Sequence, residues 1–304
     1  MQPAAATASK LMDDVWSIVV AYCSEVAPLH ALCARLSAEG SCVVVIDNTE
    51  QPSITAAQLP PGTRLVSLGA NTGIAHAQNV GVSVAVGGGA EVVVFFDQDS
   101  TFEPGFLRAL VAPLRRGSAD VVSPRCVDVD SRAEMPSQRL ATFGRVEDVF
   151  CADASTPCQT DIVISSGTAA TAEAIALAGP LDEDFFIDFV DTEWCLRCRS
   201  KRIPIRVVPQ AVMFHRIGSR SIAQGNLTIT IHSPVRCYYQ VRNSLHLFRR
   251  QHVPWLFAAR EMASVLLNRL LLLRHVNRRT DYLIAYAQGI RDGLLGVVGA
   301  KPTQ

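Results

Sequence analysis

The sequence predicts an α/β protein with a doubly wound, mostly parallel sheet. Short apolar stretches alternate with helix-length segments over residues 16–96, and this alternation is typical of strand–helix–strand units. The stretch Val92–Phe96 is apolar throughout, as expected of a strand buried on both faces. The chain has 304 residues, of which 49% are hydrophobic, so it is long enough for one large domain with an added segment.

The first part of the chain has the more regular pattern. A helix is expected to begin after Asn71 or Thr72 as its N-cap and to stop at Gly87–Gly89. The second part contains a long polar excursion over residues 128–157. In chain order we predict strands at 16–22, 42–46, 64–68, 92–96, 120–123, 161–165 and 205–208, and helices at 28–39, 73–86, 170–177 and 191–201.

We predict two domains, residues 1–232 and a basic, amphipathic helical segment, residues 233–304. From Ser233 onward the chain has eleven Lys and Arg against three Asp and Glu, although its overall formal charge is zero. The apolar stretch at 255–273 contains charged residues and falls short of a membrane-spanning helix. Residues 253–300 therefore suit either peripheral contact with an anionic membrane or helices that pack on the core with a solvated basic face.

The cysteines argue against a disulfide-bonded secreted protein and a zinc site, and the basic segment does not indicate nucleic-acid binding. The nine cysteines are scattered and no signal peptide is recognised, so we expect a reducing, cytoplasmic setting. Cys195 and Cys198 lie in an expected helix beside Trp194, which favours packing over zinc binding. Aromatic residues are sparse in the basic segment and no nucleic-acid-binding module is recognised, so no nucleic-acid partner is expected.

Two carboxylates, Asp97 and Asp99, follow the buried strand at 92–96. Ligands of open α/β sheets bind at the carboxyl ends of the strands. Paired carboxylate oxygens there suit Mg²⁺ or Mn²⁺ holding a substrate phosphate. A polar turn explains the same residues, and both interpretations stay open on this motif alone.

Further polar groups are expected along the same edge. Asp47 closes the second strand, where a carboxylate accepts a hydrogen bond from a uracil or thymine N3–H or from a ribose hydroxyl. Asn71-Thr72-Gly73 begins a helix, whose free N–H groups favour a phosphate. The block 185–194 mixes aromatic and acidic residues, and a carboxylate in such surroundings acts as a base when its pKa is raised. His215 is a candidate metal ligand, although each of these residues also has an ordinary role in a turn, cap or core.

Together these motifs resemble the family 2 glycosyltransferases of the GT-A fold, and among them the bacterial rhamnosyltransferases that build cell-surface polysaccharide. The likeness runs from Val15 to Arg250. Two positions depart from the usual pattern, since Thr49-Glu50 replaces a pair of small residues and Val190 stands where many relatives have an acid. The strings that carry the likeness are GANTGIAHAQNVGV, VVVFFDQDS, FFIDFVDTEWCLR and VVPQAVMFHRIG.

The resemblance implies a role for each matching position. Asp97 and Asp99 match the metal-binding D-x-D motif, and His215 matches the histidine that completes the site for Mg²⁺ or Mn²⁺. Asp191 matches the general base. The other matches are expected to line the nucleotide pocket (Ala21, Tyr22, Asp47, Asn71, Gly73, Asp97 and Gln98) or to face the sugar or acceptor (Glu193 and Trp194).

The resemblance also implies an inverting, metal-dependent transfer of a sugar, with rhamnose from dTDP-rhamnose favoured. The acceptor would be a hydroxyl of a saccharide or lipid-linked saccharide in polysaccharide or lipopolysaccharide synthesis, and the enzyme would be cytoplasmic or peripheral on the inner membrane. Two alternatives stay open. The string Asp97–Thr101 also fits a haloacid-dehalogenase-like phosphatase with Asp97 as nucleophile, and a non-catalytic nucleotide- or glycan-binding protein would have a similar pocket.

Overall fold

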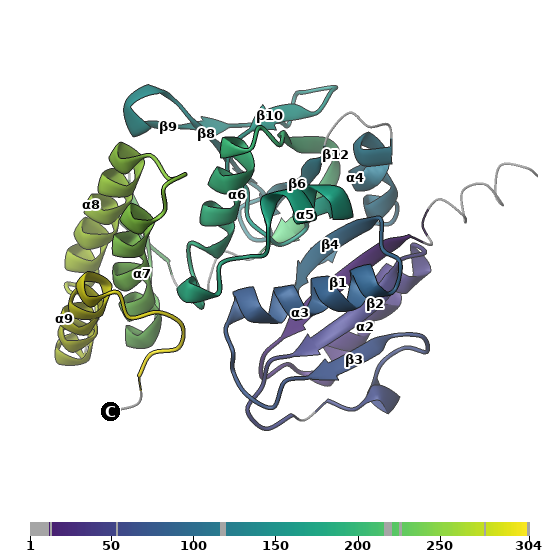
Figure 1. Ribbon diagram of the computed structural model, residues 1–304, viewed down its shortest axis with the longest axis horizontal. Coiled ribbons are helices and arrows are strands. Elements are labelled where there is room, and N and C mark those ends of the chain that lie inside the picture. Colours follow the sequence, from purple (N-terminus) through teal and green to yellow (C-terminus); the bar gives the residue numbers. More distant parts are fainter. Residues whose placement is uncertain are drawn as a thin grey trace, which may run out of the picture.

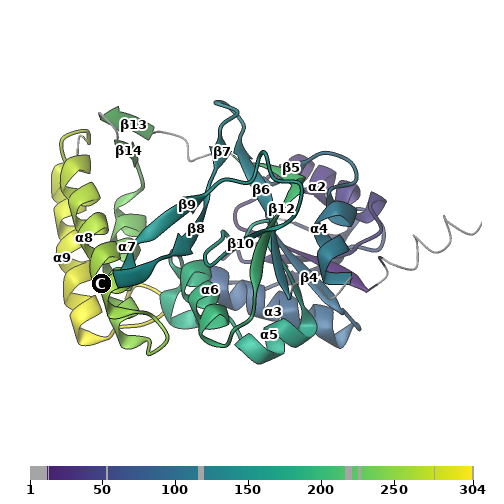
Figure 2. The same cartoon turned by 90° about the horizontal axis from the view of Figure 1, so that it is seen from above.

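A computed structural model gives the fold of the chain (Figure 1). It describes residues 12, 14–52, 54–115, 120–215, 221–224, 227–276 and 278–302. A large sheet with helices on both faces forms the main body, and a bundle of long helices lies beside it (Figures 1 and 2).

The sheet confirms the predicted α/β class. Its strand order is β10-β12-β6-β11-β4-β1-β2-β3. β3, β2, β1 and β4 are parallel, as are β6 and β12, whereas the short β11 is antiparallel to β4 and β6. The sheet is therefore mixed but mostly parallel. Its strands are β1 (Val15–Ala21), β2 (Cys42–Asp47), β3 (Arg64–Ser67), β4 (Val92–Asp97), β6 (Val121–Asp128), β10 (Cys158–Thr160), β11 (Ala169–Thr171) and β12 (Ile205–His215), with β5 (Thr101–Phe102) and β7 (Glu134–Met135) beside them.

Helices cover both faces of the sheet, which explains why its central strands are mostly apolar on both sides. Successive side chains of a strand point to opposite faces, so Ile18 packs in the core on one side and Val19 in the core on the other. The first core lies under α3 (Ile74–Gly87), α5 (Ala172–Ala178) and α6 (Val190–Ser200), and the second lies under α2 (Val26–Ala38) and α4 (Phe106–Arg115).

The C-terminal helices pack on one another around their own small core. Cys237, Leu272 and Tyr282 are buried in this core. No helix in the part of the chain that the structure describes is both long and apolar enough to cross a membrane. The division into domains at 232/233 stays a prediction. The bundle consists of α7 (Pro234–His246), α8 (Trp255–Leu272) and α9 (Arg279–Leu295).

The predicted strand at 161–165 is wrong. Ile162 and Val163 are buried, but Ile162 makes only an isolated bridge to Gln138. An apolar run thus marks burial here, not a place in the sheet. The polar excursion forms a hairpin of β8 (Ser137–Leu140) and β9 (Val146–Val149). The remaining elements are the hairpin of β13 (Ser221–Gln224) and β14 (Leu227–Thr230) and the short helices η1 (Ala56–Gln58), η2 (Thr142–Gly144), η3 (Glu183–Phe185) and η4 (Leu247–Arg249).

Candidate active site

The carboxyl ends of β1, β2 and β4 lie at one edge of the sheet because the three strands are parallel. This edge brings together Ala21, Asp47 and Asp97, as the sequence predicted. The side chain of Gln98 joins two of the strand ends, since its Oε1 accepts the Tyr22 N–H at 2.7 Å. The carbonyl of Ala21 accepts the Asn48 N–H at 2.8 Å, so both backbone groups are already hydrogen-bonded.

Asp47 has one carboxylate oxygen that is buried and unpaired. The residue is 0% exposed. Its Oδ1 accepts the Thr49 N–H at 3.2 Å, while Oδ2 has no hydrogen-bond partner among the described residues. A buried acceptor without a donor is costly, so this position suits a ligand that brings an N–H or O–H group. Thr49, a departure from the family pattern, also accepts the Cys23 N–H at 3.0 Å.

Asn71 belongs to a hydrogen-bonded network that joins the end of β2 to the start of α3. The Asn48 Oδ1 accepts the N–H and the hydroxyl of Thr72 at 2.8 and 2.9 Å. The Asn48 Nδ2 donates to the Asn71 Oδ1 at 3.3 Å, which also accepts the Gly73 N–H at 3.2 Å. The Asn71 side-chain oxygen therefore fixes the loop that joins the end of β2 to α3.

Gly73 is the N-cap of α3, so the prediction of Asn71 or Thr72 as the cap is wrong. Two N–H groups at the start of the helix are already paired, since the Gly73 N–H donates to the Asn71 Oδ1 at 3.2 Å and the Ile74 N–H to the Phe186 carbonyl at 2.7 Å. Gly73 has φ +86°, and a Cβ there would lie 2.7 Å from the Phe186 carbonyl oxygen. Glycine is needed for this close approach of two loops.

Asp191 lies in the first turn of α6 and is half-buried. Burial raises the pKa of its carboxyl, hydrogen bonds from the N–H groups of Thr192 and Ser165 oppose that rise, and the charge of Asp188 adds to it. The net pKa lies above the ordinary value for aspartate. A half-buried carboxylate with a raised pKa is suited to accept a proton.

Ser165 and Ser166 are neighbours in the chain, and they act on Asp191 and Asp97 respectively. The Ser165 backbone N–H favours the charged form of Asp191 and so acts to lower its pKa. The hydroxyl of Ser166 accepts the Asp97 N–H at 3.3 Å and lies 2.9 Å from the Ser100 hydroxyl. No sequence pattern indicates either serine, because both lie in an irregular segment.

Asp97 and Asp99 are the described residues best placed to hold a metal. Asp97 is half-buried at the end of β4, and Asp99 is exposed. No group of three His, Cys, Asp or Glu able to hold a metal occurs among the described residues, but two carboxylates with substrate phosphates suffice for Mg²⁺. The predicted ligand His215 ends β12, and its side chain lies outside the described part of the structure.

Glu193 and Trp194 do not face a ligand, and this part of the prediction is wrong. Trp194 is buried in the core under α6, and its Nε1 donates to the Gly179 carbonyl at 3.0 Å. Glu193 is 1% exposed, and its carboxylate pairs with Arg197 at 2.5 Å and His252 at 2.7 Å. Both residues follow Asp191 in α6, and the helical turn points them into the protein.

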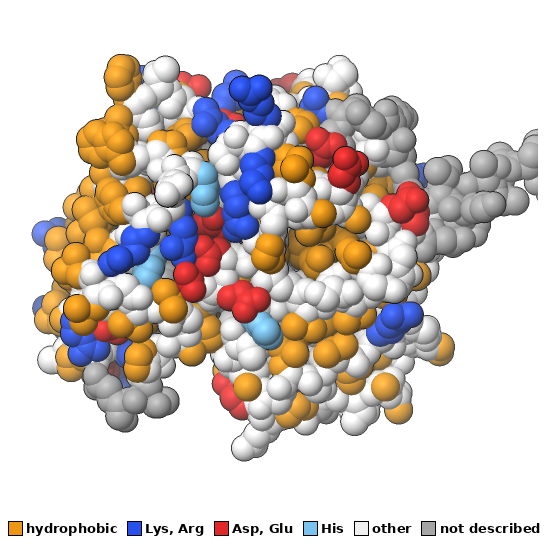
Figure 3. Space-filling model, viewed as in Figure 1, with side chains coloured by type: hydrophobic (Ala, Val, Ile, Leu, Met, Phe, Trp, Pro, Cys, Tyr) orange, Lys and Arg blue, Asp and Glu red, His pale blue; other side chains and the backbone are white. Residues whose placement is uncertain are grey.

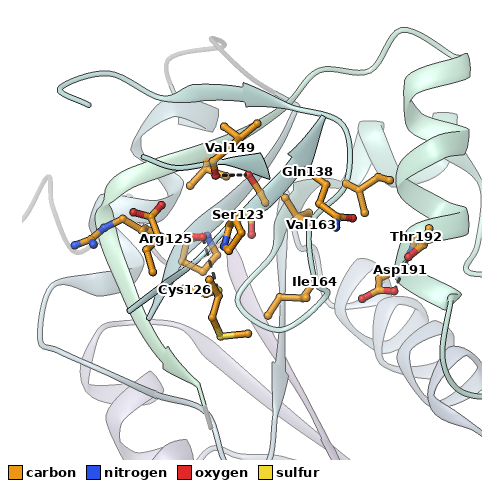
Figure 4. Close-up of a pocket in the computed structure, with 16 residues that line it drawn as sticks. Ser123, Arg125, Cys126, Gln138, Val149, Val163, Ile164, Asp191 and Thr192 are labelled. Carbon is orange, nitrogen blue, oxygen red and sulfur yellow. Dashed lines mark hydrogen bonds between the residues drawn. The ribbon is translucent and has the colours of Figure 1, made fainter. Parts of the chain in front are cut away.

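A pocket of about 220 Å³ lies beside Asp191. Figure 4 shows the Asp191 carboxylate at one side of it, with residues of β6, the β8–β9 hairpin and the 162–164 segment around the rest. The lining is partly polar and partly apolar, which is typical of small-molecule sites. It includes Ser123, Arg125, Ser137, Gln138, Ile164 and Thr192.

Comparison with known proteins agrees with this geometry. The profile described as "Glycosyl transferase family 2" matches residues 30–156. A "dTDP-rhamnosyl transferase RfbF" of Shigella flexneri is 34% identical over 288 residues, which cover 94% of this chain and 97% of the relative.

Solved structures show the same fold at low sequence identity. TarS of S. aureus is similar with a TM-score of 0.56 and 15% identity over 93% of this chain, which spans about half (49%) of that protein. A structure of TarS 1–349 with UDP-GlcNAc gives 0.54 and 14%, covering 93% of this chain and 81% of that one. GalNAc-T7 with UDP, GalNAc and Mn²⁺ gives 0.59 and 12%, covering 93% and 56%. The chain has the GT-A fold and belongs to glycosyl transferase family 2.

Proposed function

We propose that this glycosyltransferase moves rhamnose from dTDP-rhamnose to a saccharide hydroxyl with inversion of the anomeric centre. The observation that carries the proposal is the half-buried Asp191 carboxylate, which borders a pocket of about 220 Å³ and whose pKa is raised by burial. The name of the 34% identical relative supports the donor. Membership of this family removes the phosphatase alternative, and the Asp191 surroundings favour catalysis over binding alone.

Asp191 takes the role of general base in this proposal. It removes the proton from the acceptor hydroxyl, whose oxygen attacks the anomeric carbon as the bond from that carbon to the diphosphate breaks. The proton ends on Asp191 and the electron pair on the departing dTDP. A single displacement inverts the anomeric centre, and its transition state resembles an oxocarbenium ion. A positioned base contributes about 10²–10⁴-fold to such a rate.

The other side chains at the edge bind the donor. Asp47 Oδ2, buried and unpaired among the described residues, accepts the N3–H of thymine. Tyr22, which is 44% exposed, lies beside the thymine ring of the donor. Asp97 and Asp99 would hold Mg²⁺ or Mn²⁺, with His215 as a further candidate, and the cation would neutralise the charge that the diphosphate gains as it leaves.

The acceptor lies in the pocket beside Asp191. The base must contact the reacting hydroxyl, and this pocket is bounded by Asp191 on one side and by the β8–β9 hairpin on another. Its mixed lining suits the hydroxyl groups and apolar face of a sugar ring.

Nucleotide binding and product analysis test the proposal. We expect dTDP to raise the Tm of the protein more than UDP or GDP, only when Mn²⁺ or Mg²⁺ is present, and not in Asp99→Ala. We expect transfer from dTDP-rhamnose to a panel of alkyl glycosides, with the product's anomeric configuration inverted by NMR. Retention of configuration, or a metal-independent Tm shift for every nucleotide, would contradict it.

We also propose that the α8–α9 face contacts an anionic membrane, where a lipid-linked acceptor would be found. Hydrophobic side chains gather along this edge of the molecule (Figure 3), and Arg274, Arg278 and Arg279 are exposed at one end of the two helices. Apolar burial with basic anchors is the usual basis of peripheral binding. The exposed apolar residues of the face are Leu267, Leu270, Leu283, Ile284, Ile290, Leu294 and Leu295.

Sedimentation with vesicles tests this contact. We expect the protein to pellet with phosphatidylglycerol vesicles and not with phosphatidylcholine vesicles, and less so in 0.5 M salt. Leu294→Asp with Leu295→Asp should abolish pelleting without changing dTDP binding. Equal pelleting of this double variant would contradict the proposal.

A further inference from the structure

The loop that leads into α6 has a strained backbone. Phe186, Asp188 and Phe189 have φ values of +64°, +63° and +65°. Residues other than glycine rarely adopt this left-handed region, and such strain persists only where surrounding contacts hold it. Phe189 is the N-cap of α6, and Asp191 follows two residues later, so the loop sets where the helix and its carboxylate begin.

Asn243 of α7 holds this loop through its backbone. Its Nδ2 donates to the carbonyls of Phe185, Ile187 and Asp188 at 2.8, 2.7 and 3.0 Å. The side chain is fully buried. Because Ile187 and Asp188 belong to no helix or sheet, a side chain has to satisfy their carbonyls.

Arg242 supports the same contact. Its Nε donates to the Asn243 Oδ1 at 3.0 Å, which orients the amide so that Nδ2 faces the loop. Its Nη2 donates to the carbonyls of Asp184 and Phe185, each at 3.0 Å. Arg242 is also fully buried. Adjacent residues of α7 therefore bind four carbonyls in front of α6, those of Asp184, Phe185, Ile187 and Asp188.

We infer that Asn243 and Arg242 are positioning residues for Asp191, acting through the 184–189 loop. This inference rests on the proposed role of Asp191 as the base. Helix α7 fixes the loop, the loop fixes the start of α6, and the start of α6 carries the Asp191 carboxylate. A displacement of about 1 Å at a reacting group lowers a rate by about 10²-fold.

Asn243→Ala tests the inference, with Tyr238→Phe as the matched control. Tyr238 lies on the same helix, and its hydroxyl donates to Asp292 Oδ2 of α9 at 2.8 Å, so the control also loses one buried hydrogen bond of α7. Both variants should have a lower Tm. We expect kcat to fall 10–100-fold in Asn243→Ala alone, while its KM for dTDP-rhamnose and its Kd for dTDP stay within about twofold of the unchanged protein.

Hydrogen exchange of the amides over residues 187–192 gives a readout that needs no turnover. We expect faster exchange in Asn243→Ala and unchanged exchange in Tyr238→Phe. If Asn243→Ala does not fold, Asn243→Ser takes its place in the test. Serine keeps one hydrogen-bond donor, so this variant should have an intermediate exchange rate and an intermediate kcat. If exchange is faster in Asn243→Ala but the unchanged protein transfers no rhamnose, the loop contact is supported and the proposed function is overturned instead. Unchanged exchange, or equal loss of kcat in the control, would overturn the inference.

Discussion

Arg236 of α7 forms a forked ion pair with Asp188, three residues before Asp191. Its Nε lies 3.2 Å from both carboxylate oxygens of Asp188, and its Nη2 lies 3.0 Å from Oδ1. Asp188 raises the pKa of Asp191 by its charge, and the guanidinium offsets that charge. The C-terminal bundle thus influences the candidate base electrostatically as well as through the loop.

Arg236→Gln should shift the acidic limb of the pH profile to higher pH. Without the guanidinium, the charge of Asp188 acts on Asp191 uncompensated and raises its pKa further. Because the base works only when deprotonated, kcat/KM for dTDP-rhamnose should fall more at pH 5 than at pH 8.

Arg199→Gln is the matched control for this shift. Arg199 has the same side-chain exposure as Arg236, 46%, and also pairs with an aspartate, Asp161. Its removal should leave the limb in place. If the acidic limb of the kcat/KM profile moves equally in both variants, or in neither, then Asp188 and Arg236 do not act on Asp191.

Asp191→Asn should abolish transfer and raise the stability of the protein at neutral pH. The pKa of Asp191 is raised on folding, so the folded state favours the protonated carboxyl, and stability falls as pH rises through the ordinary aspartate pKa towards the folded value. Asparagine has no charge, so it removes the loss of stability that ionisation of Asp191 causes at neutral pH. The gain in Tm should be present at pH 7 and disappear below the ordinary pKa, while dTDP binding persists. A lower Tm at pH 7 would contradict the reasoning.

Much of the sheet could be predicted because its central strands are short and apolar on both faces. β1, β2 and β4 lie within a residue or two of their expected positions. The run at 161–165 wrongly predicts a strand, because a short apolar run has no periodicity that distinguishes a strand from a buried connection.

The site could be predicted only where a residue acts by its own type and position. Asp47, Asp97 and Asp191 follow from strand ends and the family motif. Ser165 and Asn243 could not be found because they act through backbone groups of distant segments, and a single sequence carries no sign of such contacts.

Asp47→Asn should weaken dTDP binding and improve CDP binding relative to it. Oδ1 is held by the Thr49 N–H, so the new amide would replace Oδ2 and present a donor to the ring N3. N3 of thymine is a donor, and N3 of cytosine is an acceptor. We expect dTDP to lose about 10–100-fold in Kd, corresponding to about 1–3 kcal/mol for an unpaired buried group. Calorimetry with dTDP and CDP measures both Kd values. An equal change for the two nucleotides would mean that the nucleobase does not contact Asp47.

We expect Glu193 to stabilise the fold and not to bind substrate, because its carboxylate is buried and paired within the protein. Burial alone would raise the pKa of Glu193, but hydrogen bonds and charge from His252 and Arg197 outweigh it and lower the pKa. The stability that this carboxylate contributes is therefore present above the ordinary glutamate pKa and is lost as pH falls through the lowered value. His252 precedes α8, so its contact with Glu193 joins α6 to the C-terminal bundle.

Glu193→Gln should destabilise the protein by about 3–5 kcal/mol, the usual cost of breaking a buried ion pair. Urea unfolding at pH 7 measures the loss, which should shrink as the pH is lowered. At a temperature where the variant is folded, its kcat should stay within about threefold of the unchanged protein. Asp191→Asn is the natural comparison, since it should have the reverse effects two residues earlier in the same helix. Loss of kcat in folded Glu193→Gln would mean that the carboxylate reaches the substrate after all.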